Sequence, residues 1–217
     1  MNKVVFFDID GVLIKKQTQK LFLNYLLRKN KISLMKAVLI YSWFMLYKLG
    51  FCKDVFRIRQ FAFKVFRNWD KEIMNRLIKG LYHDVLSLNL NLKVINRLKK
   101  HQSQNDTVVF LSATLEEIAN YLAKEFNVNY VIATKLEFIE GKYTGNISGE
   151  IPYGKNKVKL AQEFLEKNSL ILKESLGYCD HYSDLLLLNH VNKAIVVDPE
   201  DKLKRIALTK NWEILIN

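Results

Sequence analysis

Oxygen-bearing side chains follow three of the most apolar stretches of the chain. Several carboxylates gathered at one site need a cation to neutralise them, and an all-oxygen set suits Mg²⁺, which binds a few carboxylates together with water and phosphate oxygens. A phosphate group is therefore the natural ligand of such a site. The candidate residues are Asp8 and Asp10 after residues 3–7, Ser112 after residues 107–111, and Asp180 and Asp184 after residues 175–179.

These apolar stretches have the pattern of strands buried on both faces, which is typical of a parallel sheet covered by helices. Helical patterns lie between them, among them a helix predicted over residues 157–165, and the chain is predicted to end in strand, helix, strand, helix. This alternation predicts an α/β fold with a doubly wound, parallel, Rossmann-like sheet. Because ligands bind at the carboxyl ends of such strands, we expect the candidate residues to converge there.

The region after Ser112 predicts a helix. Thr114 and Glu117 have the spacing of a capping box, and apolar residues follow at helical intervals. A helix that begins just past Ser112 would favour an anion at its N-terminus. Further along, residues 131–151 predict a hairpin that turns at residues 140–142.

Residues 15–85 show helical periodicity and hardly any strand signal, with breaks at Asn30 and Gly50. We interpret this segment as a helical cap inserted after the first strand. Residues 1–14 and 86–217 then form the core domain.

The composition excludes several classes of protein. The 217 residues are 49% hydrophobic and include only 8 Gly and 2 Pro, which excludes collagen-like and disordered chains. The two cysteines, Cys52 and Cys179, are too few for a disulfide framework and have no zinc-ligand spacing. The longest apolar run, residues 37–47, is shorter than the roughly 20 residues of a membrane span. Since no secretory or transit segment is recognisable, we expect a cytoplasmic protein.

The positive charge is concentrated in one segment. The whole chain carries +12, and residues 15–80 hold 16 basic residues against Asp54, Asp70 and Glu72, a net charge of +13. Aromatic and aliphatic residues are also dense there, as in residues 41–47. Basic amphipathic helices of this kind pack as a solvated subdomain, contact an anionic membrane surface peripherally, or bind a phosphorylated substrate. No nucleic-acid partner is expected, because the segment matches no reader motif.

The motifs in this order resemble those of a known family. The Asp8-Ile9-Asp10-Gly11-Val12 segment, then Ser112, Lys157, and Asp180 with Asp184 four residues on, are similar to the four motifs of the haloacid dehalogenase superfamily. The resemblance is closest to its phosphoserine-phosphatase-like branch, subfamily IB, in which a helical cap follows the first motif. It implies a Rossmann-like core with the cap at residues 15–85.

The resemblance also implies a Mg²⁺-dependent phosphomonoester hydrolase. Asp8 would attack phosphorus to form an aspartyl-phosphate, and Asp10 would protonate the leaving oxygen and then activate water. The implied Mg²⁺ ligands are Asp8, the main-chain carbonyl of Asp10, and Asp180, with Asp184 beside them to orient Lys157 or a metal-bound water. The implied phosphate contacts are Ser112, the Ala113 amide and Lys157. Lys155 and Lys159 flank Lys157, so the spacing alone leaves open which lysine reaches the phosphate.

The substrate is a separate question. In phosphoserine phosphatases a cap Glu nine positions after the nucleophile recognises the substrate amine, and Gln17 stands at that position here, next to Lys15 and Lys16. This disfavours phosphoserine, and the basic, aromatic-rich cap favours a more anionic or amphiphilic phosphate, such as a lipid precursor. A phosphoserine-phosphatase-like enzyme for small metabolites is the first alternative. A membrane-binding module with a vestigial phosphatase core is the second.

Overall fold

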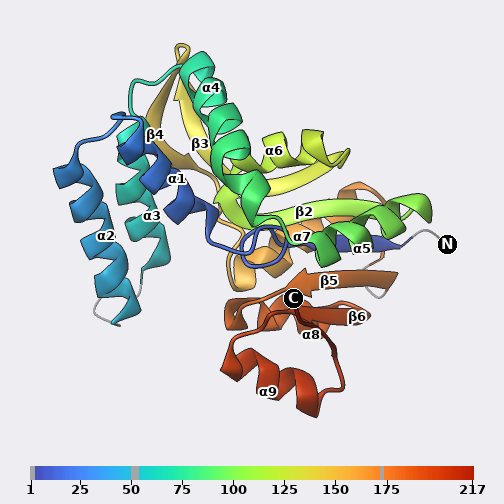
Figure 1. Cartoon of the computed structure of the whole chain (residues 1–217). Helices are drawn as coiled ribbons and strands as arrows, with labels where there is room; N and C mark the ends of the chain where they lie inside the picture. Colours follow the sequence, from blue (N-terminus) through green and yellow to red (C-terminus); the bar gives the residue numbers. More distant parts are fainter. Residues whose placement is uncertain (1–2, 50–53, 172–173) are drawn as a thin grey trace.

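The computed structural model describes residues 3–49, 54–171 and 174–217 and contains one seven-stranded sheet with the strand order β4-β3-β2-β1-β5-β6-β7 (Figure 1). All neighbouring strands are parallel except β3 and β4, which form the predicted antiparallel hairpin. The doubly wound α/β fold expected from the sequence is therefore confirmed. The strands are β1 (Val4–Phe7), β2 (Thr107–Leu115), β3 (Tyr130–Ile139), β4 (Lys142–Ser148), β5 (Ser175–Cys179), β6 (Lys193–Val197) and β7 (Glu213–Leu215).

Helices cover both faces of the sheet, as the doubly apolar strands require. Along β1, Val5 and Phe7 belong to one hydrophobic core and Val4 and Phe6 to the other, because successive side chains of a strand point to opposite faces. The first core includes α5 (Leu92–Ser103) and α6 (Glu116–Glu125), and the second includes α7 (Lys155–Lys167), α8 (Leu185–His190) and α9 (Asp201–Thr209). Cys179 is a buried free thiol, and Cys52 lies outside the described residues.

The helical segment between β1 and α5, here called the insert, forms as predicted and lies beside the sheet (Figure 1). The predicted break at Asn30 is confirmed by its left-handed backbone (φ 54°), and Gly50 lies outside the described residues. That this segment forms a separate cap domain remains a prediction. Its helices are α1 (Thr18–Arg28), α2 (Leu34–Lys48), α3 (Val55–Phe63) and α4 (Lys71–Leu81), with a 3₁₀ turn at Lys64–Phe66, a π-helical turn at Tyr82–Leu86 and another 3₁₀ turn at Ser87–Asn89.

The prediction that a helix begins just past Ser112 is wrong. Strand β2 runs through Ser112 to Leu115, which pairs with Thr134 of β3 after a shift in register, and α6 begins only at Glu116. Thr114 does not cap this helix, since its hydroxyl lies 2.5 Å from the hydroxyl of Thr18 in α1. Pairing with β3 and contact with the insert therefore override the local capping pattern.

The end of the chain also differs from the prediction. The last helix, α9, is followed by strand β7, which pairs in parallel with β6 through Val196 and Ile214. The added strand is only three residues long, too short to give a clear period-two pattern.

Candidate active site

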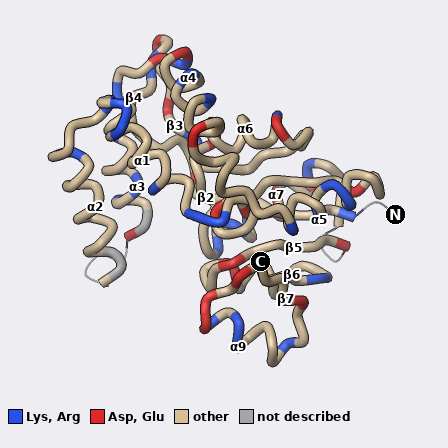
Figure 2. The backbone as a smooth tube through the Cα atoms, viewed as in Figure 1, with Lys and Arg blue, Asp and Glu red and all other residues tan. Residues whose placement is uncertain are grey.

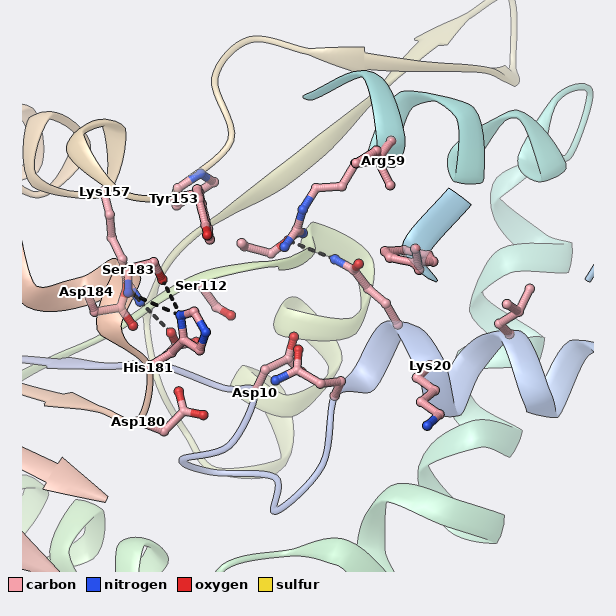
Figure 3. A pocket seen from close by; sticks show the side chains of 18 of the residues that line it. Asp10, Lys20, Arg59, Ser112, Tyr153, Lys157, Asp180, His181, Ser183 and Asp184 are labelled. Carbon is pink, nitrogen blue, oxygen red and sulfur yellow. Dashed lines mark hydrogen bonds and ion pairs between the residues drawn. The ribbon is translucent and has the colours of Figure 1, made fainter. Parts of the chain in front are cut away.

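The carboxyl ends of β1 and β5 bring the predicted acidic residues together (Figure 3). Asp8 directly follows β1 and Asp180 directly follows β5, while Asp184 ends the short 3₁₀ turn at Tyr182–Asp184. Each of the three carboxylates offers one oxygen, and these oxygens lie within 4.8 Å of one another. The convergence expected from the sheet topology is observed for these three residues.

Lys157 occupies the buried side of this cluster. Its Nζ donates a hydrogen bond to Oδ2 of Asp8 and lies 3.0 Å from Oδ1 of Asp184, and the residue is only 1% exposed. Burial by itself would lower the pKa of Lys157, but the carboxylates of Asp184 and Asp8 raise the pKa well above its usual value, so the side chain is a permanent cation. Lys155, in contrast, is exposed. Of the lysines that the spacing left open, Lys157 is the one in contact with the cluster.

One lysine does not balance three carboxylates. Burial, followed by the charges of Asp8 and Asp184, raises the pKa of Asp180 to about 8, and burial likewise raises the pKa of Asp184 to about 6. These raised pKa values mean that ionising both carboxyl groups is unfavourable here, because of desolvation and mutual repulsion. A divalent cation that accepts oxygen ligands would relieve both costs, so the donor set fits Mg²⁺.

Asp10 lines the same cavity as this cluster and contacts the helical insert. Its Oδ1 accepts a hydrogen bond from the amide of Thr18 at 2.6 Å, at the beginning of α1. Burial is the main cause that raises the pKa of Asp10 to about 6. A carboxyl group with this pKa is suited to exchange a proton near neutral pH. The carboxylate of Asp10 is not part of the group formed by Asp8, Asp180 and Asp184, which agrees with its implied role in proton transfer; the resemblance assigns only its main-chain carbonyl to the metal.

Ser112 and Ala113 lie on the neighbouring strand β2, with Ser112 fully buried. The carbonyl oxygen of Ala113 accepts hydrogen bonds from three side chains: Gln19 of α1 (3.1 Å), Arg59 of α3, and Thr134 of β3 (2.9 Å). Two of these donors belong to the insert. The backbone next to Ser112 is thus fixed by helices that lie far away in the sequence.

A cavity of about 520 Å³ extends from the carboxylates into the insert. The predicted site residues line it together with residues that the sequence did not reveal, of which Arg59 and Tyr153 are labelled in Figure 3. Arg59 is one of 16 basic residues in its segment, and nothing in the sequence distinguishes it. The lining residues are Asp8, Asp10, Gln17, Gln19, Lys20, Leu23, Tyr41, Phe44, Met45, Ile58, Arg59, Ser112, Ala113, Pro152, Tyr153, Lys157, Asp180, His181, Ser183 and Asp184.

Gly11 allows the loop after β1 to approach Asp180. Its φ is +74°, and a Cβ at this position would overlap the carboxylate of Asp180. Replacing Gly11 by Ala is expected to displace Asp180 and to lower the affinity for Mg²⁺ by roughly 10–100-fold, measured by isothermal titration calorimetry. Gly149→Ala is the matched control, because Gly149 has φ +78° but nothing within 4 Å of an added Cβ. If both variants lost the same affinity for Mg²⁺, the close approach of Gly11 to Asp180 would have no specific role.

Comparison with known proteins identifies the family to which the chain belongs. A family model of haloacid dehalogenase-like hydrolases matches residues 5–189. The chain belongs to this family, and the prediction of an enzyme of this family, made from the motifs, is confirmed.

Individual relatives match the chain over its whole length. A histidinol-phosphatase from Neisseria meningitidis serogroup C (strain 8013) is 23% identical over 219 residues and covers 99% of both chains. The crystal structure of a protein of unknown function from Bordetella pertussis Tohama I has a TM-score of 0.92 at 22% identity, again covering 99% of both chains. A phosphoserine phosphatase solved as a phospho-aspartyl intermediate analogue has a TM-score of 0.69 at 14% identity, covering 99% of this chain and 93% of its own. The fold is thus shared with phosphoserine phosphatases.

Proposed function

We propose that this protein is a Mg²⁺-dependent phosphomonoester hydrolase that works through an aspartyl-phosphate on Asp8. The observation that supports this most directly is the placement of Asp8: its carboxylate lines the cavity and is hydrogen-bonded to the buried Lys157. Asp10, two residues on, lines the same cavity with a carboxyl group whose pKa is raised to about 6. Membership of a hydrolase family, and the phosphatase named among the relatives, support the same reaction.

The reaction would proceed in two displacements. A carboxylate oxygen of Asp8 forms a bond to phosphorus while the bond from phosphorus to the ester oxygen breaks, and Asp10 gives its proton to the departing alkoxide. Water then attacks the phosphorus of the acyl phosphate, Asp10 takes a proton from this water, and the carboxylate of Asp8 is released with inorganic phosphate. Bound Mg²⁺, held by Asp8, Asp180 and Asp184, would offset the negative charge of the phosphoryl group. Lys157 and the Ser112 hydroxyl would hold the phosphoryl oxygens.

The walls of the cavity favour an amphiphilic leaving group. On the side of the insert the cavity is lined by apolar side chains and by two cations, Lys20 and Arg59. Every acidic residue that lines it belongs to the core, at positions 8, 10, 180 and 184. The part of the wall that faces the leaving group therefore offers apolar contact and positive charge, as a lipid-type or other strongly anionic phosphate requires. The apolar lining residues are Leu23, Tyr41, Phe44, Met45 and Ile58.

A small aminoalkyl phosphate is the second candidate, and it is favoured by the whole-length similarity to a histidinol-phosphatase. Such a substrate carries an ammonium group, which a carboxylate commonly binds. Gln17 lines the cavity as a neutral amide, and Lys20 would repel an ammonium. These residues support the amphiphilic substrate over the aminoalkyl one.

Phosphate release from a substrate series tests both candidates. We expect kcat/KM to rise from ethyl to decyl phosphate by up to about fourfold per methylene buried against the insert, and to exceed the values for phosphoserine and histidinol phosphate. Phe44→Ala should flatten this rise, whereas Phe56→Ala, on the exposed surface of α3 outside the cavity, should not.

Other outcomes of this series are equally informative. Preference for phosphoserine or histidinol phosphate would establish the small-metabolite alternative. Failure of folded, Mg²⁺-supplied protein to hydrolyse any member of the series would favour a binding module with a vestigial core.

A further inference from the structure

Helix α2 exposes a continuous apolar face, here named the α2 stripe. Its members follow one another at helical spacing and are between 42% and 79% exposed. Two exposed polar residues, Lys36 and Ser42, lie in the same stretch of sequence. In Figure 1 the helix lies on the outer side of the insert, away from the sheet, and in Figure 2 it is almost entirely in the colour of uncharged residues. The α2 stripe consists of Leu34, Met35, Val38, Leu39, Met45 and Leu46.

The packing of the insert does not require these side chains to be apolar. The opposite face of α2 already supplies its buried contacts: Ala37 and Ile40 are at most 5% exposed, and the helix packs on α1 and α3. Of the α2 stripe, Met45 alone also lines the cavity. Apolar patches of this kind on a soluble surface mark interaction sites.

The charge around the α2 stripe identifies its partner. Lys31 and Lys36 are exposed at the N-terminal end of the helix. The four acidic residues of the insert are already engaged, since Asp54 pairs with Arg57, Glu72 with Arg76 and Asp84 with Lys29, and Asp70 caps α4. A second copy of this chain would bring two segments of net charge +13 together, which is unfavourable. An anionic lipid surface accepts the apolar side chains and attracts the surrounding cations.

We propose that the α2 stripe docks this protein onto the surface of an anionic lipid bilayer. The helix lies in the interface rather than across it: its 15 residues span only about 22 Å, less than the hydrocarbon core, and no helix among the described residues is long and apolar enough to cross a membrane. The opposite side of the same helix lines the cavity through Tyr41 and Phe44, so docking places the cavity wall next to lipid. The proposal concerns location and goes beyond the proposed reaction.

Co-sedimentation of the full chain with vesicles tests this docking. The protein is expected to bind vesicles of phosphatidylcholine and phosphatidylglycerol in a three-to-one ratio, to bind pure phosphatidylcholine weakly, and to be released by salt. The double variant Met35→Glu/Leu39→Glu should lower binding by roughly tenfold or more, because two exposed apolar anchors are lost. Leu92→Glu/Leu208→Glu is the matched control, since it makes the same change in charge at exposed leucines of α5 and α9, outside the insert.

Three results would overturn the docking proposal. These are absence of binding by the unaltered protein, equal losses in the two double variants, and a dimer of the unaltered protein that Met35→Glu/Leu39→Glu converts to a monomer, which would assign the α2 stripe to a second copy. Hydrolysis of a soluble aryl phosphate is measured in parallel. Because Met35 and Leu39 do not line the cavity, their substitution should leave this rate unchanged, so failure of docking and failure of the proposed reaction are distinguishable.

Discussion

Replacing Asp8 by Asn is expected to lower the rate of phosphate release by roughly 10⁴-fold or more, because the residue proposed to form the covalent bond can no longer attack phosphorus. The change keeps the shape of the side chain and removes one of three crowded carboxylates. Lys157 keeps a partner, since Asp184 lies 3.0 Å from its Nζ. The variant should therefore fold, and circular dichroism should match that of the unaltered protein.

The covalent step can be measured separately from turnover. Acid quenching during hydrolysis of a ³²P-labelled phosphomonoester should trap a phosphoprotein that hydroxylamine cleaves, and Asp8→Asn should give none. Asp184→Asn is the matched control, because it changes the same cluster but keeps the proposed nucleophile, and it should still give labelled protein. An Asp8→Asn variant that keeps more than a tenth of the rate would place the nucleophile elsewhere.

Replacing Lys157 by Met is expected to lower the free energy of unfolding by about 3–5 kcal/mol when Mg²⁺ is removed by a chelator, because the buried carboxylates of Asp8 and Asp184 lose their cation. Chemical denaturation with and without Mg²⁺ measures this loss. Mg²⁺ bound by the carboxylates should restore part of the stability. It should not restore phosphate release, since the proposed contact of Lys157 with the phosphoryl group is missing.

Lys155→Met is the control for this substitution. Lys155 lies two residues earlier on the same helix but is exposed, so its loss should change stability by less than about 0.5 kcal/mol. If the two variants were equally stable without Mg²⁺, Lys157 would not be the cation that stabilises the cluster.

The sequence predicts those parts of the site that depend on strands and on their carboxyl ends. Asp8 and Asp180 follow buried apolar strands, and parallel pairing of β1 with β5 is enough to bring them together. The start of α6 could not be predicted in this way. The extension of β2 past Ser112 depends on pairing with β3 and on the contact between Thr114 and Thr18, two residues 96 positions apart.

The wall of the cavity on the side of the insert could not be predicted for a related reason. Helix α2 is apolar almost all the way round, so its periodicity does not tell which face packs inside and which faces solvent. Arg59 reaches the carbonyl of Ala113 from α3, which packs on α2 and β4. Such contacts between distant segments leave no local pattern. Cytoplasmic location, likewise inferred from the sequence, remains a prediction.

The carbonyl of Ala113 makes the position of the insert and the backbone of β2 beside Ser112 interdependent. Gln19 and Arg59 both donate to this oxygen, so α1 and α3 cannot swing away from the sheet without releasing the backbone beside Ser112. Because the acceptor belongs to the main chain, no side-chain substitution at position 113 deletes it. The strength of this contact is therefore set at positions 19 and 59, so substitutions there loosen the hold of α1 and α3 on the site while every acidic residue of the site stays in place.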